Sequence, residues 1–206
     1  MRTALALCLA SLPALAAVPE PGEGTITLLG SVRTIIPNNQ SYMNDVFATG
    51  HNAVQPGGIA AFGYQYDEEL HVKIELGFLY DKYRIPVGGD LTVKTIPLLL
   101  GLDYGFFRRD RFTFFLGGGL GYLLNTGDRG GASNEANSTG AYASLGFRVQ
   151  LGGPIALVIE DRYLLGSAQA DAGNSTKTLN VGGNLLSVGV MVHFLEPEEK
   201  GHPVGH

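Results

Sequence analysis

The 206-residue sequence contains no tryptophan, a single cysteine (Cys8), and no run of about 18 apolar residues after position 17. Because the cysteine lies near the start, disulfide bonds cannot stabilise the rest of the chain. The missing apolar runs exclude transmembrane helices of ordinary length. Charged residues make up only 16% of the chain, the formal net charge is -5, and no long basic segment occurs. This charge pattern argues against nucleic acid as a partner.

The first 17 residues, MRTALALCLASLPALAA, are typical of a secretory signal. Arg2 provides the positive start, and residues 4–12 form an apolar core that is too short to span a bilayer. Residues 14–16 match an A-x-A cleavage site, so we expect cleavage after residue 16 or 17. The expected mature protein has one domain, residues 18–194, and a short polar tail, residues 195–206.

The remaining sequence alternates between apolar and polar residues at every second position, which predicts β-strands. Thirty glycines and moderate charge favour many strands and turns. The predicted strands are residues 24–33, 57–66, 70–81, 91–106, 112–124, 139–151, 155–165 and 182–194. No segment of normal helix length repeats with a period of 3.6 residues.

The connections between these strands alternate in length. The long ones are polar and cover residues 34–56, 82–90, 125–138 and 166–181, whereas the short ones cover 67–69, 107–111 and 152–154. Short turns on one side and long loops on the other are typical of outer-membrane barrels. The sequence therefore predicts an all-β fold, an eight-stranded antiparallel up-and-down transmembrane β-barrel. An even strand number predicts that both termini are periplasmic and that four loops are extracellular.

One face of each predicted strand is apolar, and the other carries small and charged residues. In the strand 91–106, Leu98, Leu100 and Leu102 alternate with Gly101 and Asp103. A soluble barrel with an apolar interior is the alternative, but it needs an outer face covered with charge. The side chains of the second face are too small and too sparsely charged to form a soluble exterior, and they suit the narrow lumen of an eight-stranded barrel. We therefore predict that the apolar face contacts lipid.

Three stretches carry a resemblance to a known family: TIPLLLGLDYGFFRRDRFTFFLGGGLGYLL (95–124), VIEDRYLL (158–165) and SVGVMVHF (187–194). They resemble strands of the outer-membrane protein β-barrel domain family, the small eight-stranded OmpA/OmpX/opacity-type barrels. The resemblance implies that the barrel-assembly machinery recognises the last strand. The expected assembly signal consists of Leu186, Val188, Val190, Val192 and Phe194. In such barrels the aromatic is often the final residue, whereas here twelve residues follow Phe194.

The alternation also places charged residues in the lumen. The expected interior polar network consists of Lys73, Glu75, Asp103, Arg148, Glu160 and Arg162. Buried charges must pair to offset their desolvation, so we expect ion pairs that close the lumen, with a narrow conducting pathway as the alternative. The same alternation places Asp161 on the lipid-facing side, where a carboxylate is unfavourable.

We expect a non-enzymatic outer-membrane protein with a structural or surface-interaction role through its four extracellular loops. The alternatives are binding or passage of small hydrophobic molecules and, less favoured, a lipid A-modifying enzyme. No residue is assigned to catalysis, to a metal or to a cofactor, because no histidine is matched to a convincing serine and acid. The expected partners are outer-membrane lipid and lipopolysaccharide, and we expect a monomer. The basic residues expected near lipopolysaccharide phosphates are Arg33, Lys82, Arg84, Lys94, Arg129 and Lys177.

Overall fold

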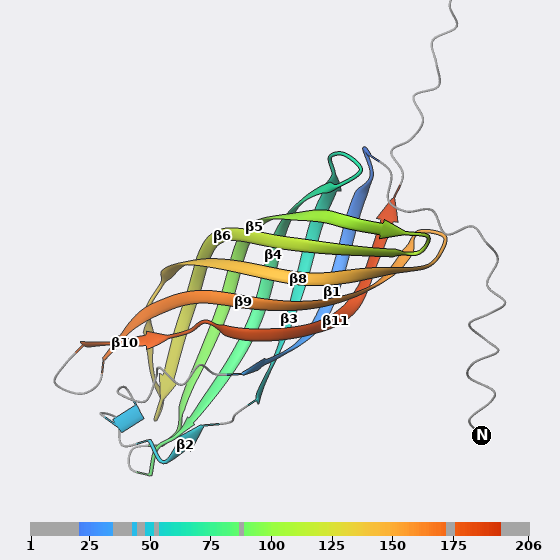
Figure 1. Cartoon of the computed structure of the whole chain (residues 1–206). Helices are drawn as coiled ribbons and strands as arrows, with labels where there is room; N and C mark the ends of the chain where they lie inside the picture. The colour runs from blue at the N-terminus through green and yellow to red at the C-terminus, as the bar shows by residue number, and fades with distance from the viewer. Residues whose placement is uncertain are drawn as a thin grey trace, which may run out of the picture.

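Eight long antiparallel strands close into a barrel in the computed structural model, which describes residues 21–34, 43–44, 48–51, 54–86, 89–171 and 176–194 (Figure 1). The long strands are β1 (Gly24–Thr34), β3 (Val54–Gln65), β4 (Leu70–Arg84), β5 (Leu91–Arg109), β6 (Phe112–Arg129), β8 (Ser138–Gly152), β9 (Ile155–Asp171) and β11 (Gly183–Phe194). Each pairs with its neighbour in this order, and β11 pairs with β1 to close the barrel. The described residues contain no helix that is long and apolar enough to cross a membrane.

The two ends of the barrel differ. At the short-turn end lie the turns at residues 66–69, 110–111 and 153–154, together with the paired residues Gly24 and Phe194. In the first of these turns, Asp67 accepts hydrogen bonds from the backbone N–H groups of Glu69 and Leu70, at 2.8 and 2.7 Å. These bonds favour the ionised carboxylate and lower the pKa of Asp67 below its ordinary value. The opposite end is called the long-loop end below.

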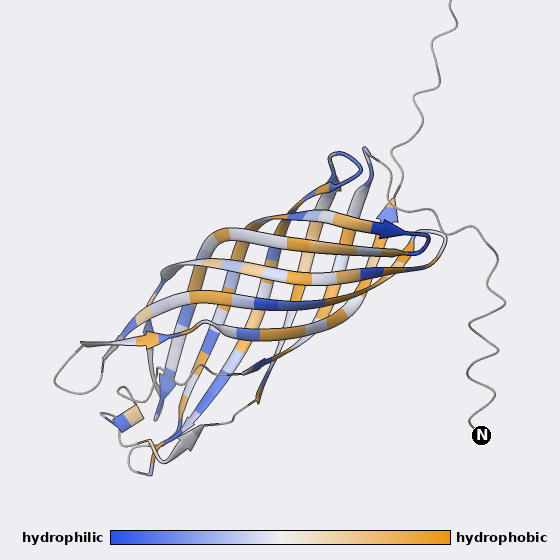
Figure 2. Ribbon diagram, in the orientation of Figure 1, coloured by the Kyte–Doolittle hydropathy of each residue, from blue (hydrophilic) through white to orange (hydrophobic). Residues whose placement is uncertain are grey.

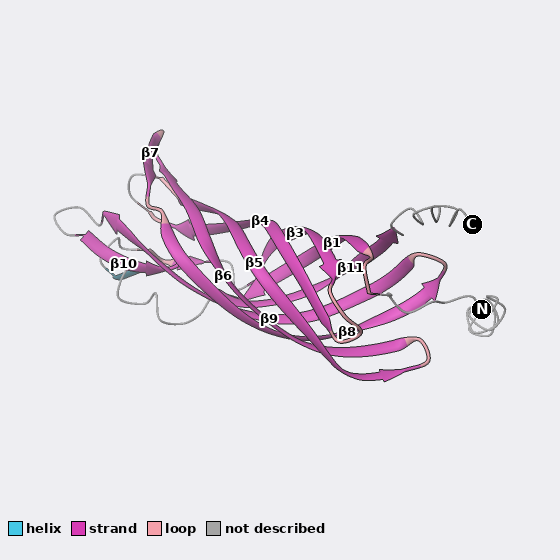
Figure 3. Cartoon of the chain, turned by 90° about the horizontal axis from the view of Figure 1, so that it is seen from above, coloured by secondary structure: helices cyan, strands magenta, loops and turns pink. Residues whose placement is uncertain are grey.

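Three short strands lie at the long-loop end: β2 (Gly50–His51), β7 (Ala132–Glu135) and β10 (Thr176–Asn180) (Figures 1 and 3). The prediction of loops at 34–56, 125–138 and 166–181 was therefore wrong in part. β6 continues to Arg129 and turns back into β7 through two glycines with positive φ, while β9 continues to Asp171 and pairs with β10. β7 is exposed throughout, and the described side chains of the β9 extension and β10 include only Ala168 and Leu179 as buried apolar residues, so alternation of hydrophobicity does not reveal these strands.

The exterior of the barrel is apolar, as predicted. Along β5, Leu98, Leu100 and Leu102 are 49–59% exposed, whereas Leu99 and Asp103 on the opposite face are buried. The same alternation runs around the wall, and Figure 2 shows it as hydrophobic and hydrophilic bands along each strand. A continuous apolar surface of this size is incompatible with a stable existence in water, so the barrel wall requires lipid.

The last strand follows this rule along its whole length. Leu186, Val188, Val190, Val192 and Phe194 all face outward, and the residues between them face the lumen. β11 pairs with β9 on one side and with β1 on the other, so it is the strand that closes the sheet. Its recognition by the assembly machinery stays a prediction. The expected signal, residues 1–17, and the expected tail, residues 195–206, lie outside the described residues.

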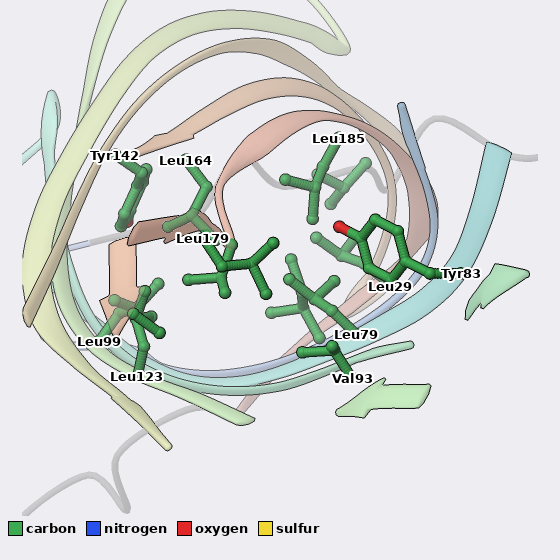
Figure 4. Packing of buried hydrophobic residues seen from close by; sticks show 14 of the residues in the cluster. Leu29, Leu79, Tyr83, Val93, Leu99, Leu123, Tyr142, Leu164, Leu179 and Leu185 are labelled. Carbon is green, nitrogen blue, oxygen red and sulfur yellow. The ribbon is translucent and has the colours of Figure 1, made fainter. Parts of the chain in front are cut away.

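The core of the protein is the lumen. Its apolar part lies toward the long-loop end, where leucines from different strands point at one another across the barrel (Figure 4). The leucines of this part include Leu29, Leu79, Leu99, Leu123, Leu164 and Leu185, all 6% exposed or less. Leu79 is an apolar residue on the otherwise polar inward face of β4, and it belongs to this cluster. On both sides of these leucines along the barrel axis, the lumen carries polar side chains.

Candidate functional site

A continuous chain of buried ion pairs crosses the lumen. It consists of the six residues that the alternation placed inside the barrel: Lys73, Glu75, Asp103, Arg148, Glu160 and Arg162. Lys73 stands in the middle, with its Nζ atom 2.9 Å from Glu75 Oε1 and 2.9 Å from Asp103 Oδ1. Lys73 and Glu75 come from β4 and Asp103 comes from β5. The three residues therefore lie on two neighbouring strands.

The chain continues on both sides to arginines from β8 and β9, and it ends at Arg148 on one side and at Glu160 on the other. Arg148 donates a hydrogen bond to Asp103 Oδ2. Arg162 donates to both oxygens of Glu75, including a bond of 2.9 Å from Nη2 to Oε1, and also donates to Glu160 Oε1 at 2.8 and 3.0 Å. The six residues carry three positive and three negative charges. Each charge therefore has at least one opposite partner, which buried charges need in a low-dielectric interior.

Two aromatic rings pack against the ion pairs. The guanidinium carbon of Arg162 lies 4.0 Å from the ring centre of Tyr142, and that of Arg148 lies 4.6 Å from the ring centre of Phe115. The Tyr142 hydroxyl also donates to Glu75 Oε1 at 3.1 Å. The cavity left at this level measures about 10 Å³, which is no more than the space for one water molecule.

The close packing requires a glycine opposite Tyr142. A Cβ atom on Gly101 would collide with the Tyr142 hydroxyl oxygen. We expect Gly101→Ala to push the ring away from Arg162 and to lower the free energy of unfolding by about 1–3 kcal/mol, measured by urea titration in lipid vesicles. Gly30→Ala is the matched control, because its Cβ would meet only Val188 O at 3.8 Å. Equal effects of the two substitutions would contradict this packing.

His71 extends the network toward the short-turn end. Its Nε2 atom is hydrogen-bonded to Thr25 Oγ1 at 2.8 Å, and its Nδ1 atom lies 3.6 Å from Asp103 Oδ2. This order of hydroxyl, imidazole and carboxylate resembles a catalytic triad. However, Thr25 and His71 are at most 1% exposed, and Asp103 is held by Lys73 as well, so a substrate has no access to the hydroxyl. In the described ranges, no group of three or more His, Cys, Asp or Glu side chains is placed to hold a metal ion.

Two charged residues outside the network have partners that the sequence did not reveal. Asp161 faces outward, as expected, and accepts a hydrogen bond of 2.8 Å from Asn184 Nδ2 on the neighbouring strand β11. The expectation that Arg33 contacts lipopolysaccharide is wrong, because its side chain is only 1% exposed. Arg33 pairs with Asp81 inside the barrel and donates to Val181 O at 2.6 Å.

A large cavity opens at the long-loop end. Its volume is about 980 Å³, and it is lined by β5, β6, β7, β8, β9 and β10. The apolar part of its lining consists of Leu91, Val93, Ala132, Ala136, Ala168, Leu179 and Val181. Amides and hydroxyls form most of the remainder, among them Asn125, which donates to Ala136 O at 2.8 Å. The lining of the cavity thus combines apolar and polar side chains.

The barrel wall beside this cavity has an incomplete ladder. Pairing between β8 and β9 ends at Gly140 and Gly166, and beyond this point β9 pairs with β10 instead. We call this place the β8–β9 seam. A second hollow of about 820 Å³ on the outer side of the wall is lined by lipid-facing Leu120 and Leu165. It shares Thr139, Ser167 and Thr178 with the cavity at the long-loop end.

Sequence reasoning missed several residues of the site. No role is assigned from the sequence to Phe115 or to Tyr142, whose rings contact the arginines of the ion-pair chain. The alternation of the strands places both rings on the inward face. A large aromatic side chain on this narrow face must pack against the charges there, so both residues could have been predicted. The cavity residues of β7 and β10 carry no such signal, since these strands were expected to be loops.

A closed barrel with an apolar wall and paired charges in its lumen defines a small transmembrane β-barrel protein. A family model of the outer membrane protein beta-barrel domain matches residues 3–194, and the chain belongs to this family. It is therefore a protein of the outer membrane. No curated protein sequence matches the chain significantly.

Solved structures support the fold. Neisserial surface protein A (NspA) is 17% identical with a TM-score of 0.59, and the match covers 86% of this chain and 100% of NspA. OprG from Pseudomonas aeruginosa is 16% identical with a TM-score of 0.56, covering 86% and 98%. The attachment invasion locus protein Ail of Yersinia pestis, in complex with the heparin analogue sucrose octasulfate, is 12% identical with a TM-score of 0.52, covering 84% and 99%.

Proposed function

We propose that this protein is a non-enzymatic outer-membrane barrel that has a structural or surface-interaction role at its long-loop end. One observation supports this most: the lumen is filled by the ion-pair chain, whereas the long-loop end carries a cavity of about 980 Å³. A catalytic role is not favoured, because the Thr25–His71–Asp103 group is buried. The surface role is in line with the similarity to Ail, whose solved complex contains a heparin analogue.

The proposed orientation places the long-loop end outside the cell and the short-turn end, with both termini, in the periplasm. Short periplasmic turns and longer extracellular loops are the rule in bacterial barrels. An epitope inserted between Gly130 and Gly131, the turn of the β6–β7 hairpin, is expected to be labelled on intact cells. The same epitope at Gly153, in a short turn, is expected to be labelled only after the outer membrane is opened. The reverse pattern would contradict the orientation.

Lipopolysaccharide is the proposed contact of the extracellular end, and the barrel-assembly machinery is a partner during insertion. We propose a monomer and no nucleic-acid partner. Of the basic residues expected to contact lipopolysaccharide, Lys82 and Lys94 are exposed at this end, where they pair with Asp90 and Asp128 at 2.9 and 3.0 Å. These pairs reduce the positive charge available to phosphates. The side chain of Lys177 lies outside the described residues.

A closed lumen leads to an electrical prediction. Purified wild-type protein in a planar bilayer is expected to show no steady conductance, because the space among the ion pairs is about 10 Å³. Glu160→Ala removes a buried carboxylate at the end of the chain without touching the long-loop end. If the wild type conducts and Glu160→Ala alters that conductance, the protein is a channel and the proposal fails. The epitope experiment is independent of this outcome.

The second candidate function is capture of small hydrophobic molecules and their release into the membrane, and the β8–β9 seam favours it. A disulfide between Thr139→Cys and Ser167→Cys, the next register position beyond Gly140 and Gly166, would tie the seam shut. Transfer of an apolar fluorescent probe into lipid vesicles is then expected to fall and to recover with reductant. Unchanged transfer by the oxidised protein would exclude a route through the seam.

A further inference from the structure

The β5–β6 hairpin at the short-turn end has an unusual sequence, FFRRDRFTFF (106–115), in which two aromatic pairs surround three arginines. The strand register shifts between Gly105 and Phe107, where β5 contains a bulge. A bulge adds a residue and changes the side to which the following side chains point. Here it brings two consecutive rings to the outer surface: Phe106 is 51% exposed and Phe107 is 49% exposed.

The rings of this hairpin continue onto the next strand. Phe107 on β5 lies 5.8 Å from Phe114 on β6 in an edge-on arrangement, and Phe114 lies 5.9 Å from Phe147 on β8. These are centroid distances of interacting aromatic pairs. The result is a row of three rings across three strands on the lipid-facing wall, directly next to the arginine turn.

The arginines of the turn are not equivalent. Arg108 interacts electrostatically with the acidic turn at 67–69. In contrast, neither Arg109 nor Arg111 forms an ion pair with any described residue. The adjacent turn on their other side, residues 152–154, is uncharged. Among the described residues, these two cations of an otherwise acidic protein have no carboxylate partner, and they lie beside the row of rings.

We propose that the β5–β6 hairpin binds a phospholipid with an anionic headgroup. Arg109 and Arg111 hold the headgroup phosphate through charge-assisted hydrogen bonds, for which guanidinium groups are well suited. The acyl chains lie against Phe107, Phe114 and Phe147. The turn is also tied to the neighbouring strand, because the backbone carbonyl of Arg111 accepts a hydrogen bond of 2.8 Å from the Gln150 N–H group on β8.

The absence of tryptophan provides a specific probe for this site. Phe147→Trp places a single fluorophore beside Phe114, where bromine atoms on lipid acyl chains quench it. The full chain is inserted into phosphatidylcholine nanodiscs that contain a minor fraction of brominated phosphatidylglycerol or, separately, the same fraction of brominated phosphatidylcholine. Both leaflets have the same composition, so the result does not depend on which way the barrel faces in cells.

We expect phosphatidylglycerol to be enriched about tenfold over phosphatidylcholine at the tryptophan, since each basic residue near a membrane surface adds to the attraction for anionic lipid. Arg109→Gln combined with Arg111→Gln is expected to abolish this enrichment, and each single substitution to reduce it. About 1 M salt, which shortens the screening length to about 3 Å, should weaken it in the parent protein. Because these changes leave the backbone bond to Gln150 in place, the barrel should still fold, as its heat-dependent gel migration will verify.

The control is Lys82→Gln combined with Lys94→Gln, which removes the same charge at the long-loop end. This variant is expected to keep the enrichment. Equal quenching by the two brominated lipids in the parent protein would overturn the proposal. So would enrichment that survives loss of both arginines, or that is lost to the same degree in the lysine control, because the attraction would then come from net charge alone.

Discussion

Arg162→Ala is expected to destabilise the barrel by about 3–5 kcal/mol, because it leaves Glu75 and Glu160 charged and buried without their shared partner. The loss includes the contact of the guanidinium with the Tyr142 ring. The free energy of unfolding is measured by urea titration in lipid vesicles, with the folded fraction read from heat-dependent gel migration. Lys82→Ala, which breaks an exposed ion pair, is the control and is expected to cost at most about 1 kcal/mol.

A charge-balanced variant separates the effect of an unpaired charge from the effect of lost packing. Glu160→Gln combined with Arg162→Met removes one negative and one positive charge. It leaves the neutral chain of Arg148, Asp103, Lys73 and Glu75 intact. We expect this variant to be more stable than Arg162→Ala, since no buried charge is left without a partner. If the two variants unfold at the same urea concentration, the ion pairs do not govern stability and the lumen is held by packing alone.

The second large effect concerns the outer wall. Leu100 is 59% exposed on β5, and its neighbours on the same face are also leucines. Leu100→Arg is expected to cost about 2–4 kcal/mol or to prevent insertion, because it places a guanidinium in the apolar band that faces lipid. The measurement is the yield of folded barrel in vesicles, followed by urea titration of the inserted fraction.

Ser133→Arg on β7 is the matched control for the wall. Ser133 is exposed at the long-loop end, beyond the apolar band, so its replacement is expected to change stability by no more than about 0.5 kcal/mol. If Leu100→Arg folds and unfolds like the parent protein, this face of the barrel meets water rather than hydrocarbon. That result would contradict the membrane-spanning wall itself.

The strands could be predicted from sequence because a barrel wall imposes one rule on every residue. A side chain such as Leu100 meets lipid and the next, Gly101, meets a crowded lumen, so hydrophobicity alternates along most of each strand, with inward leucines such as Leu99 as exceptions. The rule fails where the wall leaves the membrane. Residues 132–135 form β7 but are exposed throughout, and nothing in their composition separates a solvated strand from a solvated loop.

The candidate site was predictable only in part. Parity alone assigns Glu75 and Arg162 to the lumen, but their contact crosses the barrel between residues 87 positions apart in the sequence. That contact depends on the closure of the barrel and on strand register, which alternation does not specify. For Arg33 the alternation was informative but was not followed. Arg33 is two positions after inward-facing Ser31 and therefore lies on the same face of β1, yet its position near a predicted loop suggested solvent.

The pairing of β1 with β11 has a consequence for the order of events during folding. Gly24 meets Phe194, so the two partners of this ladder are synthesised at opposite ends of the domain. Until the last strand arrives, β1 presents a row of unpaired N–H and C=O groups, which hydrocarbon cannot satisfy. A protein that loses its final twelve strand residues therefore leaves one edge of β1 unpaired in hydrocarbon. β1 then keeps its ladder with β3 alone, and the sheet has an open edge where the complete barrel is closed.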